Sequence, residues 1–141
     1  MKVVVGVFAA LMACACASGP QISGPRPPQG PGPGGTQFGF WDRDADAAVD
    51  ASFRAYITRT YNAGEEAMAR TALETDGFKC RDGNRPEGRP VPALECERLY
   101  SDNQIVHTWT VEFWPGEREP RAHYSRIQRR DDLKEHDEKH K

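Results

Sequence analysis

The clearest structural signal in this chain is the segment Ile105-Val106-His107-Thr108-Trp109-Thr110-Val111-Glu112-Phe113-Trp114. Bulky side chains alternate with threonine and glutamate, which is the period-two pattern of a strand with one buried face. Trp109, Val111 and Phe113 share one face, and we expect that face to enter the core. The threonines and the glutamate would then lie on the opposite, partly solvated face.

Three further strands are expected around this segment, because turn residues divide the second half of the chain into short runs. Their expected positions are residues 78–80, 93–100 and 122–128. Ser101-Asp102-Asn103 and Pro115-Gly116 supply the turns on either side of the central strand. In the last strand Tyr124 and Ile127 differ in parity, which predicts a bulge or a shift of register there.

Two helices are predicted before the strands. Apolar residues recur at intervals of three and four over residues 44–61 and again over residues 65–75. Gly64 separates the two runs, and Gly77 stands where a left-handed C-terminal cap belongs. The residues of the second helix that are expected to face inward are Ala67, Met68, Ala72 and Leu73. Two N-terminal helices packed on a three- to four-stranded antiparallel β-meander define an α+β domain of two layers.

The N-terminus is typical of the leader of an exported bacterial lipoprotein. Lys2 gives it a short positive start, and the uncharged run that follows ends before Gly19, short of the roughly 20 residues that span a bilayer. The sequence Leu11-Met12-Ala13-Cys14 is similar to the cleavage site of lipoprotein signal peptides, with Cys14 as the residue that receives the lipid. Two other outcomes stay open: cleavage before Cys16, or ordinary cleavage after Ala17, which would release a secreted soluble domain.

Lipidation at Cys14 would fix the place of the protein in the cell. Several acyl chains, each contributing about 0.8 kcal/mol for every buried methylene, bind such a protein to the membrane. Lipoproteins that stay in the inner membrane usually carry an aspartate directly after the modified cysteine, and here Ala15 stands at that position. In a host with two membranes, this resemblance implies an outer-membrane lipoprotein that faces the periplasm.

Composition divides the chain into four parts. These are a signal peptide at residues 1–13, the lipidated cysteine with a Pro/Gly-rich tether at residues 14–37, the α+β domain at residues 38–130, and a charged tail at residues 131–141. Glycine and proline dominate the tether and leave it no apolar face, so we expect a spacer that contributes nothing to the core. The tail has one aliphatic residue, Leu133, so it is expected to be a frayed helix or disordered.

The two cysteines inside the domain, Cys80 and Cys96, are expected to form a disulfide. Export places them in an oxidising compartment, where such pairs persist. A closed loop of about 15 residues would stabilise the fold by about 3 kcal/mol in the chain-entropy model.

Charge and motifs exclude several classes of function. The chain has 19 basic and 21 acidic residues, so it carries no basic excess for nucleic acid. No cofactor motif is present, and the glycines of the tether open no helix that could cradle a phosphate.

His136 and His140, with Asp137 between them, have the spacing of metal ligands on a helix, but a charged tail favours solvated side chains. His107 is interpreted as a histidine at the edge of the core with a backbone partner, because no nucleophile lies at motif spacing. We therefore expect no enzyme, no metal site and no cofactor.

Three residues of the sheet are candidates for a protein interface. Trp114 has the parity opposite to the core residues and lies next to a turn, so it could be exposed on the open face of the sheet. Tyr124 and Arg126 lie near it in the predicted meander, and aromatic residues and arginine are enriched at binding hot spots. The alternative, in which neighbouring loops shield Trp114, stays open.

The order of elements resembles a known class of envelope protein. Gly64, Leu73 and Gly77-Phe78, together with the strand order over residues 63–129, resemble the SmpA/OmlA (BamE-like) type of small outer-membrane lipoprotein. That resemblance implies a non-enzymatic scaffolding module with an envelope protein as its partner. The same unit of two helices and an open sheet also resembles the repeats of the β-lactamase inhibitory protein, which keeps a periplasmic inhibitor or ligand-binding protein as the alternative.

Overall fold

The computed structural model describes residues 24–30, 37–83, 88 and 90–129. Two helices, α1 (Asp46–Thr60) and α2 (Glu66–Thr75), come first in the sequence. Four strands follow them: β1 (Lys79–Asp82), β2 (Leu94–Asp102), β3 (Ile105–Phe113) and β4 (Arg121–Gln128). The predicted α+β class is therefore confirmed, with four strands in the sheet.

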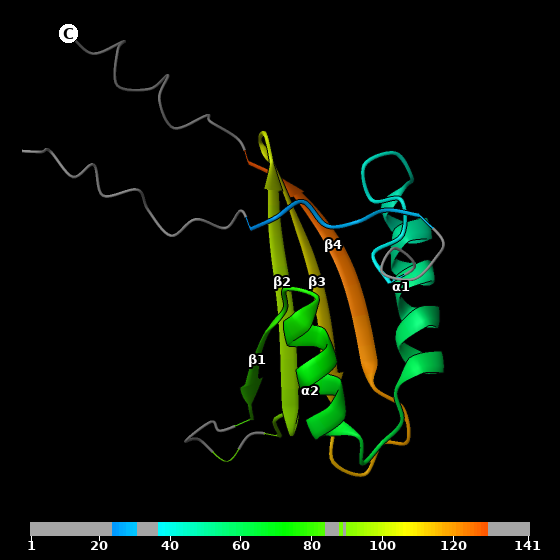
Figure 1. Cartoon of the computed structure of the whole chain (residues 1–141), viewed down its shortest axis with the longest axis vertical. Coiled ribbons are helices and arrows are strands. Elements are labelled where there is room, and N and C mark those ends of the chain that lie inside the picture. Colours follow the sequence, from blue (N-terminus) through cyan, green and yellow to red (C-terminus); the bar gives the residue numbers. More distant parts are fainter. Residues whose placement is uncertain (1–23, 31–36, 84–87, 89, 130–141) are drawn as a thin grey trace, which may run out of the picture.

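The sheet is an antiparallel meander in which each strand pairs with its neighbour in sequence. The strand order is β1-β2-β3-β4, so β3 lies inside the sheet and pairs along its length with both β2 and β4. Figure 1 shows α2 in front of the sheet at the β1–β2 side, and α1 beside the edge strand β4. The helices and the sheet form two layers with the core between them.

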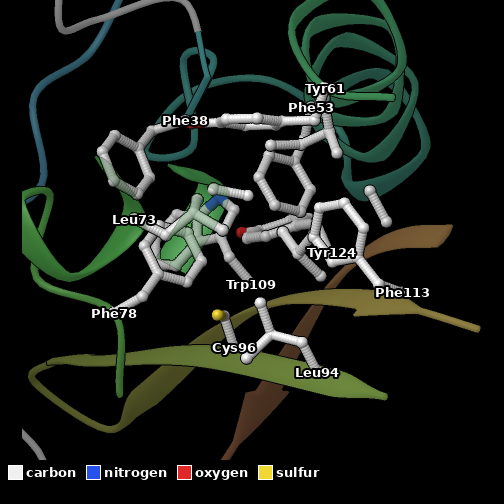
Figure 2. Close-up of a cluster of buried hydrophobic side chains, with 14 of the residues drawn as sticks. Phe38, Phe53, Tyr61, Leu73, Phe78, Leu94, Cys96, Trp109, Phe113 and Tyr124 are labelled. Atoms are coloured by element: carbon white, nitrogen blue, oxygen red, sulfur yellow. The ribbon is translucent and has the colours of Figure 1, made fainter. Parts of the chain in front are cut away.

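The core face of β3 is the face that its alternation predicts. Trp109, Val111 and Phe113 are buried, and the residues between them are partly exposed. Neighbouring strands add Leu94, Cys96 and Tyr124 to the same face, as Figure 2 shows. Aromatic rings fill much of the core, where Phe38 packs edge to face on Trp109 with 5.3 Å between ring centroids. Such pairs add stabilisation beyond the area they bury.

The helices bury narrow apolar stripes. The buried residues of α1 are Val49, Phe53 and Ile57, which are four residues apart and share one face. In α2 the buried residues are Ala69 and Leu73, while Ala67 is exposed and 58% of Met68 is exposed. The inward placement expected for Ala67 and Met68 is wrong, because Leu73 sets the helical phase and Ala69, one turn earlier, shares its face.

α2 ends in the predicted left-handed cap. Gly77 has a φ of 88°, and its N–H donates to the carbonyl of Glu74 at 3.1 Å. The N–H of Phe78 donates to the carbonyl of Leu73 at 3.0 Å, which completes a Schellman motif. A side chain at Gly77 would also meet the Arg98 guanidinium, since an added Cβ would lie 2.9 Å from Nη1.

β4 contains no bulge. Its register with β3 is continuous from Ile105↔Gln128 to Glu112↔Arg121. Ile127 faces away from the core instead, and 63% of its surface is exposed. The predicted irregularity is wrong because it rested on the assumption that every aliphatic residue of the strand enters the core.

Part of the expected tether packs against the domain. Residues 24–30 are described, and Pro27 among them is fully buried. Gln37, assigned to the tether as well, is 2% exposed. The packed unit therefore includes chain on the N-terminal side of residue 38, which differs from the expectation of a spacer that contributes nothing to the core.

Candidate functional site

The predicted disulfide is present between β1 and β2. Cys80 and Cys96 form a cross-strand pair with a Cα–Cα distance of 4.0 Å. Cys96 lies in the core and Cys80 packs against it. This bridge fixes the short edge strand β1 to the rest of the sheet.

His107 is a buried structural residue. Its Nδ1 lies 2.8 Å from the Tyr124 hydroxyl, so its polar partner is a side chain and not the backbone group that we expected. The rings of Trp41 and Trp109 pack on it with centroid distances of 4.8 Å and 5.9 Å. Burial lowers the pKa of His107, and the positive charge of Arg126 lowers it further. Burial therefore disfavours the charged imidazole, and Nδ1 already has the Tyr124 hydroxyl as its hydrogen-bond partner. Both observations fit a histidine that packs in the core.

The three residues predicted as an interface do not form one surface. Tyr124 is buried and packs on Trp109, so it has no surface to offer a partner and this expectation is wrong. Arg126 is opposite His107 in the register, and its Nη2 lies 2.5 Å from Asp46 Oδ1. Parity explains both results, because Tyr124 and Arg126 alternate toward the helix side of β4.

Trp114 is half-buried, at the end of β3. Its indole N–H donates to Glu112 Oε2 at 2.7 Å, and the Arg121 guanidinium lies 4.7 Å from the ring centroid. Arg121 is in turn paired with Glu117. The ring is therefore covered by Glu112 of β3 and by Arg121, the first residue of β4, which is closer to the alternative of a shielded Trp114 that sequence reasoning left open.

The open face of the sheet is defined here by the side chains that alternate away from the core. They are Lys79, Arg81, Glu95, Glu97, Leu99, Ser101, Val106, Thr108, Thr110, Glu112, Arg121, His123, Ser125 and Ile127. One end is charged and internally matched, with Arg81 paired to Glu95. The other end is apolar, since Leu99 is 37% exposed, Ile127 is 63% exposed, and Val106 lies opposite Ile127 in the register. These three apolar side chains make this end less polar than the rest of the face, although Ser101, Thr108 and Ser125 lie among them.

An open groove of about 660 Å³ lies where α1 meets the charged end of this face. Its lining includes Arg54 and Thr58 of α1 and Glu112, Glu117 and Arg121 of the sheet and turn. Because acidic and basic side chains are mixed there, the groove does not select a ligand of one charge. Thr110 and His123 of this lining lie opposite each other in the register, and Nδ1 of His123 lies 3.1 Å from Asp50 Oδ1.

Asp50 of α1 occupies the exposed edge of β4. Its Oδ1 accepts from the backbone N–H of Tyr124 at 2.7 Å and lies 3.1 Å from His123 Nδ1. Its Oδ2 accepts from Arg54 at 2.5 Å. A free strand edge invites pairing with other chains, so this carboxylate protects the sheet from edge-to-edge association.

The described part of the chain contains no group of three or more histidine, cysteine, aspartate or glutamate residues that could hold a metal. His136 and His140 lie outside the described residues, as do Cys14 and Cys16. Neither described helix has the length and apolarity that a membrane span requires.

Comparison with known proteins finds no relative: no family model, no curated protein and no solved structure matches this chain.

Proposed function

We propose that this chain is a bacterial cell-envelope lipoprotein whose α+β domain is a non-enzymatic protein-interaction module on the periplasmic side of the outer membrane. The sequence Leu11-Met12-Ala13-Cys14 carries the proposal, because it combines a leader of export length with a cysteine at the lipoprotein position. The resemblance to the SmpA/OmlA type supports the scaffolding role.

The disulfide supports export. Cys80 and Cys96 are bridged within the fold, and such bridges persist in the periplasm and not in the reducing cytosol. The domain uses both of its cysteines in this way, which leaves the cysteines near the leader for lipid.

The apolar end of the open face supports an interaction module. Leu99, Val106 and Ile127 are presented by three adjacent strands, so they form a rigid surface. A partner that covers this end would remove apolar area from water at little conformational cost.

A second candidate is a secreted inhibitor or ligand-binding protein. Ala15 and Ala17 have the small side chains that ordinary signal peptidase requires. The groove beside α1 offers such a protein a concave surface.

The lipid is tested by growing cells that express the full chain in labelled palmitate. We expect label on the wild type and on Cys16→Ser, and none on Cys14→Ser. Alkylation after denaturation without reductant should leave Cys80 and Cys96 unmodified. An unlabelled protein with a formed disulfide would favour the secreted candidate, and an unlabelled protein with free domain thiols would remove both.

The interaction surface is tested by photo-crosslinking in cells. A photoreactive amino acid at Ile127 should trap an envelope protein, whereas the same probe at Arg59, an exposed residue of α1, should not. Equal yields at the two positions would contradict an interface on the open face.

A further inference from the structure

A proline-rich segment docks on the folded domain in this structure. The docked segment, residues 25–30, has the sequence Pro-Arg-Pro-Pro-Gln-Gly. It lies outside the helices and strands, and Figure 1 shows it as the blue trace that crosses the sheet toward the chain before α1. The ring of Pro27 is fully buried.

The domain recognises this segment through backbone carbonyls. The carbonyl of Pro25 accepts from Arg98 Nη2 at 2.7 Å, and the carbonyl of Pro27 accepts from the indole Nε1 of Trp41 at 3.3 Å. Proline fixes φ and disfavours a helical conformation in the residue before it, so this sequence favours the polyproline II conformation. That conformation has no internal hydrogen bonds, which leaves alternate carbonyls free for donors on an aromatic surface.

Arg26 adds sequence specificity. Its guanidinium lies 4.9 Å from the centroid of the Trp41 ring, and its Nη2 lies 3.0 Å from Asp42 Oδ2. Cation–π stacking and an ion pair together favour arginine over other residues at this position. At the far end, Gly30 fits under the Phe40 ring, where an added Cβ would lie 2.9 Å from the ring.

Arg98 explains why the site selects a carbonyl. Its side chain is buried, and both of its hydrogen bonds within the described part of the chain go to backbone carbonyls, those of Asp76 and Pro25. The guanidinium also lies 4.9 Å from the Phe38 ring centroid. A buried cation needs acceptors for its donors, and the docked segment supplies one of them.

We infer that Trp41, Asp42 and Arg98 form a binding site for a proline-rich segment that contains arginine, and that its occupant is this chain's own Pro25–Gly30.

If the chain is anchored at Cys14 as proposed above, docking shortens the tether. Eleven residues from Cys14 to Pro25 reach at most about 40 Å, whereas 23 residues to Gln37 would reach at most about 80 Å. Docking thus holds the domain near the membrane, and its release would double the reach.

The docking is tested on the full chain by NMR of the Trp41 indole N–H. The variant Arg26→Glu/Pro27→Gly changes only the docked segment and places a second negative charge beside Asp42. We expect hydrogen exchange at this indole to become at least tenfold faster, while the protected amides of β3 stay unchanged. Arg59→Glu is the matched control, because it makes the same change of charge at an exposed residue of α1 that lies outside the docked segment. Equal indole exchange in the wild type and the double variant would overturn the proposal.

The recognition is tested in trans with a synthetic peptide of residues 24–30. We expect saturable binding that restores the Trp41 indole signal of the double variant, and no binding to the wild type, whose site is filled. Peptide binding to both proteins, or to neither, would overturn the assignment. A size that rises with protein concentration in the wild type would also overturn it, since each segment would then dock on a second copy.

The shorter tether is tested on vesicles that carry the lipidated chain. Energy transfer from a fluorescent amino acid at Gln128 to labelled lipid headgroups should be stronger in the wild type than in the double variant. Equal transfer would overturn the effect on reach. A chain that fails to sediment with vesicles would instead contradict lipidation, and the indole exchange would still decide the docking.

Discussion

The imidazole of His107 is enclosed by aromatic rings, and this position makes the stability of the fold depend on pH. Because burial holds its pKa below the ordinary value of 6.5, the unfolded chain takes up a proton more readily than the folded chain. Stability is therefore complete above about pH 6.5 and is lost as pH falls from there toward the lower pKa of the folded state.

We expect the free energy of unfolding to fall by up to about 1.4 kcal/mol per pH unit within that window because of His107. Urea unfolding at pH 7.5 and 5.5 measures the difference. The variant His107→Gln should show a smaller difference. An identical pH dependence in His107→Gln and the wild type would contradict this account.

Asp50 gives a second prediction at the level of one residue. Asp50→Ala removes the acceptor of the Tyr124 N–H, so a backbone donor at the edge of β4 loses its partner. We expect a loss of about 1–3 kcal/mol in the free energy of unfolding, measured by urea, and a rise in concentration-dependent association. Asp44→Ala, in the loop before α1, is the control and should change neither. A monomeric Asp50→Ala with unchanged stability would show that the carboxylate does not protect the edge.

At the level of elements, β1 depends on its disulfide. The strand has four residues and lies at the edge of the sheet, with Cys80 opposite Cys96 in the register. The bridge closes a sequence separation of 16 residues. Replacing both cysteines by alanine should lower the free energy of unfolding by about 3 kcal/mol. Amide exchange should rise most at residues 79–82. Uniform destabilisation without faster local exchange would contradict a specific role for the bridge in holding β1.

The elements also show which parts of the fold local sequence can predict. β3 was predictable because its burial alternates with every residue, and the cap at Gly77 was predictable because only a local conformation is needed there. The buried face of α2 was not predictable in this way, because Ala67, Met68 and Ala69 are consecutive apolar residues that cannot all face the core. Only the position of Leu73 in the core decides that Ala69 is the buried one.

Long-range partners account for the rest of what sequence reasoning missed. Pro25 and Arg98 are 73 residues apart in the sequence, so no local sequence pattern contains both of them. A proline-rich stretch followed closely by Trp41 was the available signal, since such segments bind aromatic surfaces. The same holds for Asp50 and Tyr124, whose contact depends on where α1 lies beside the sheet.

At the level of the whole molecule, the proposed anchor and the folded domain are linked by the docked segment. The domain keeps its aromatic core beneath the helices and presents the opposite face of the sheet to its surroundings (Figures 1 and 2). An anchor at Cys14 and a segment docked at Pro25 would together limit how far that face can move from the membrane. The position of the lipid therefore matters for which partners the face can reach.

Ala15, the residue after the proposed lipidation site Cys14, allows the modified cysteine to be identified. In a host with two membranes, Ala15→Asp should move the protein from the outer to the inner membrane if Cys14 carries the lipid, because lipoproteins retained there usually have aspartate at that position. Ala17→Asp is the matched control and should leave the protein in the outer membrane. Fractionation of the two membranes followed by immunoblotting measures both. The reverse result, with Ala17→Asp alone retained in the inner membrane, would place the lipid on Cys16. The chain between the membrane and Pro25 would then be two residues shorter.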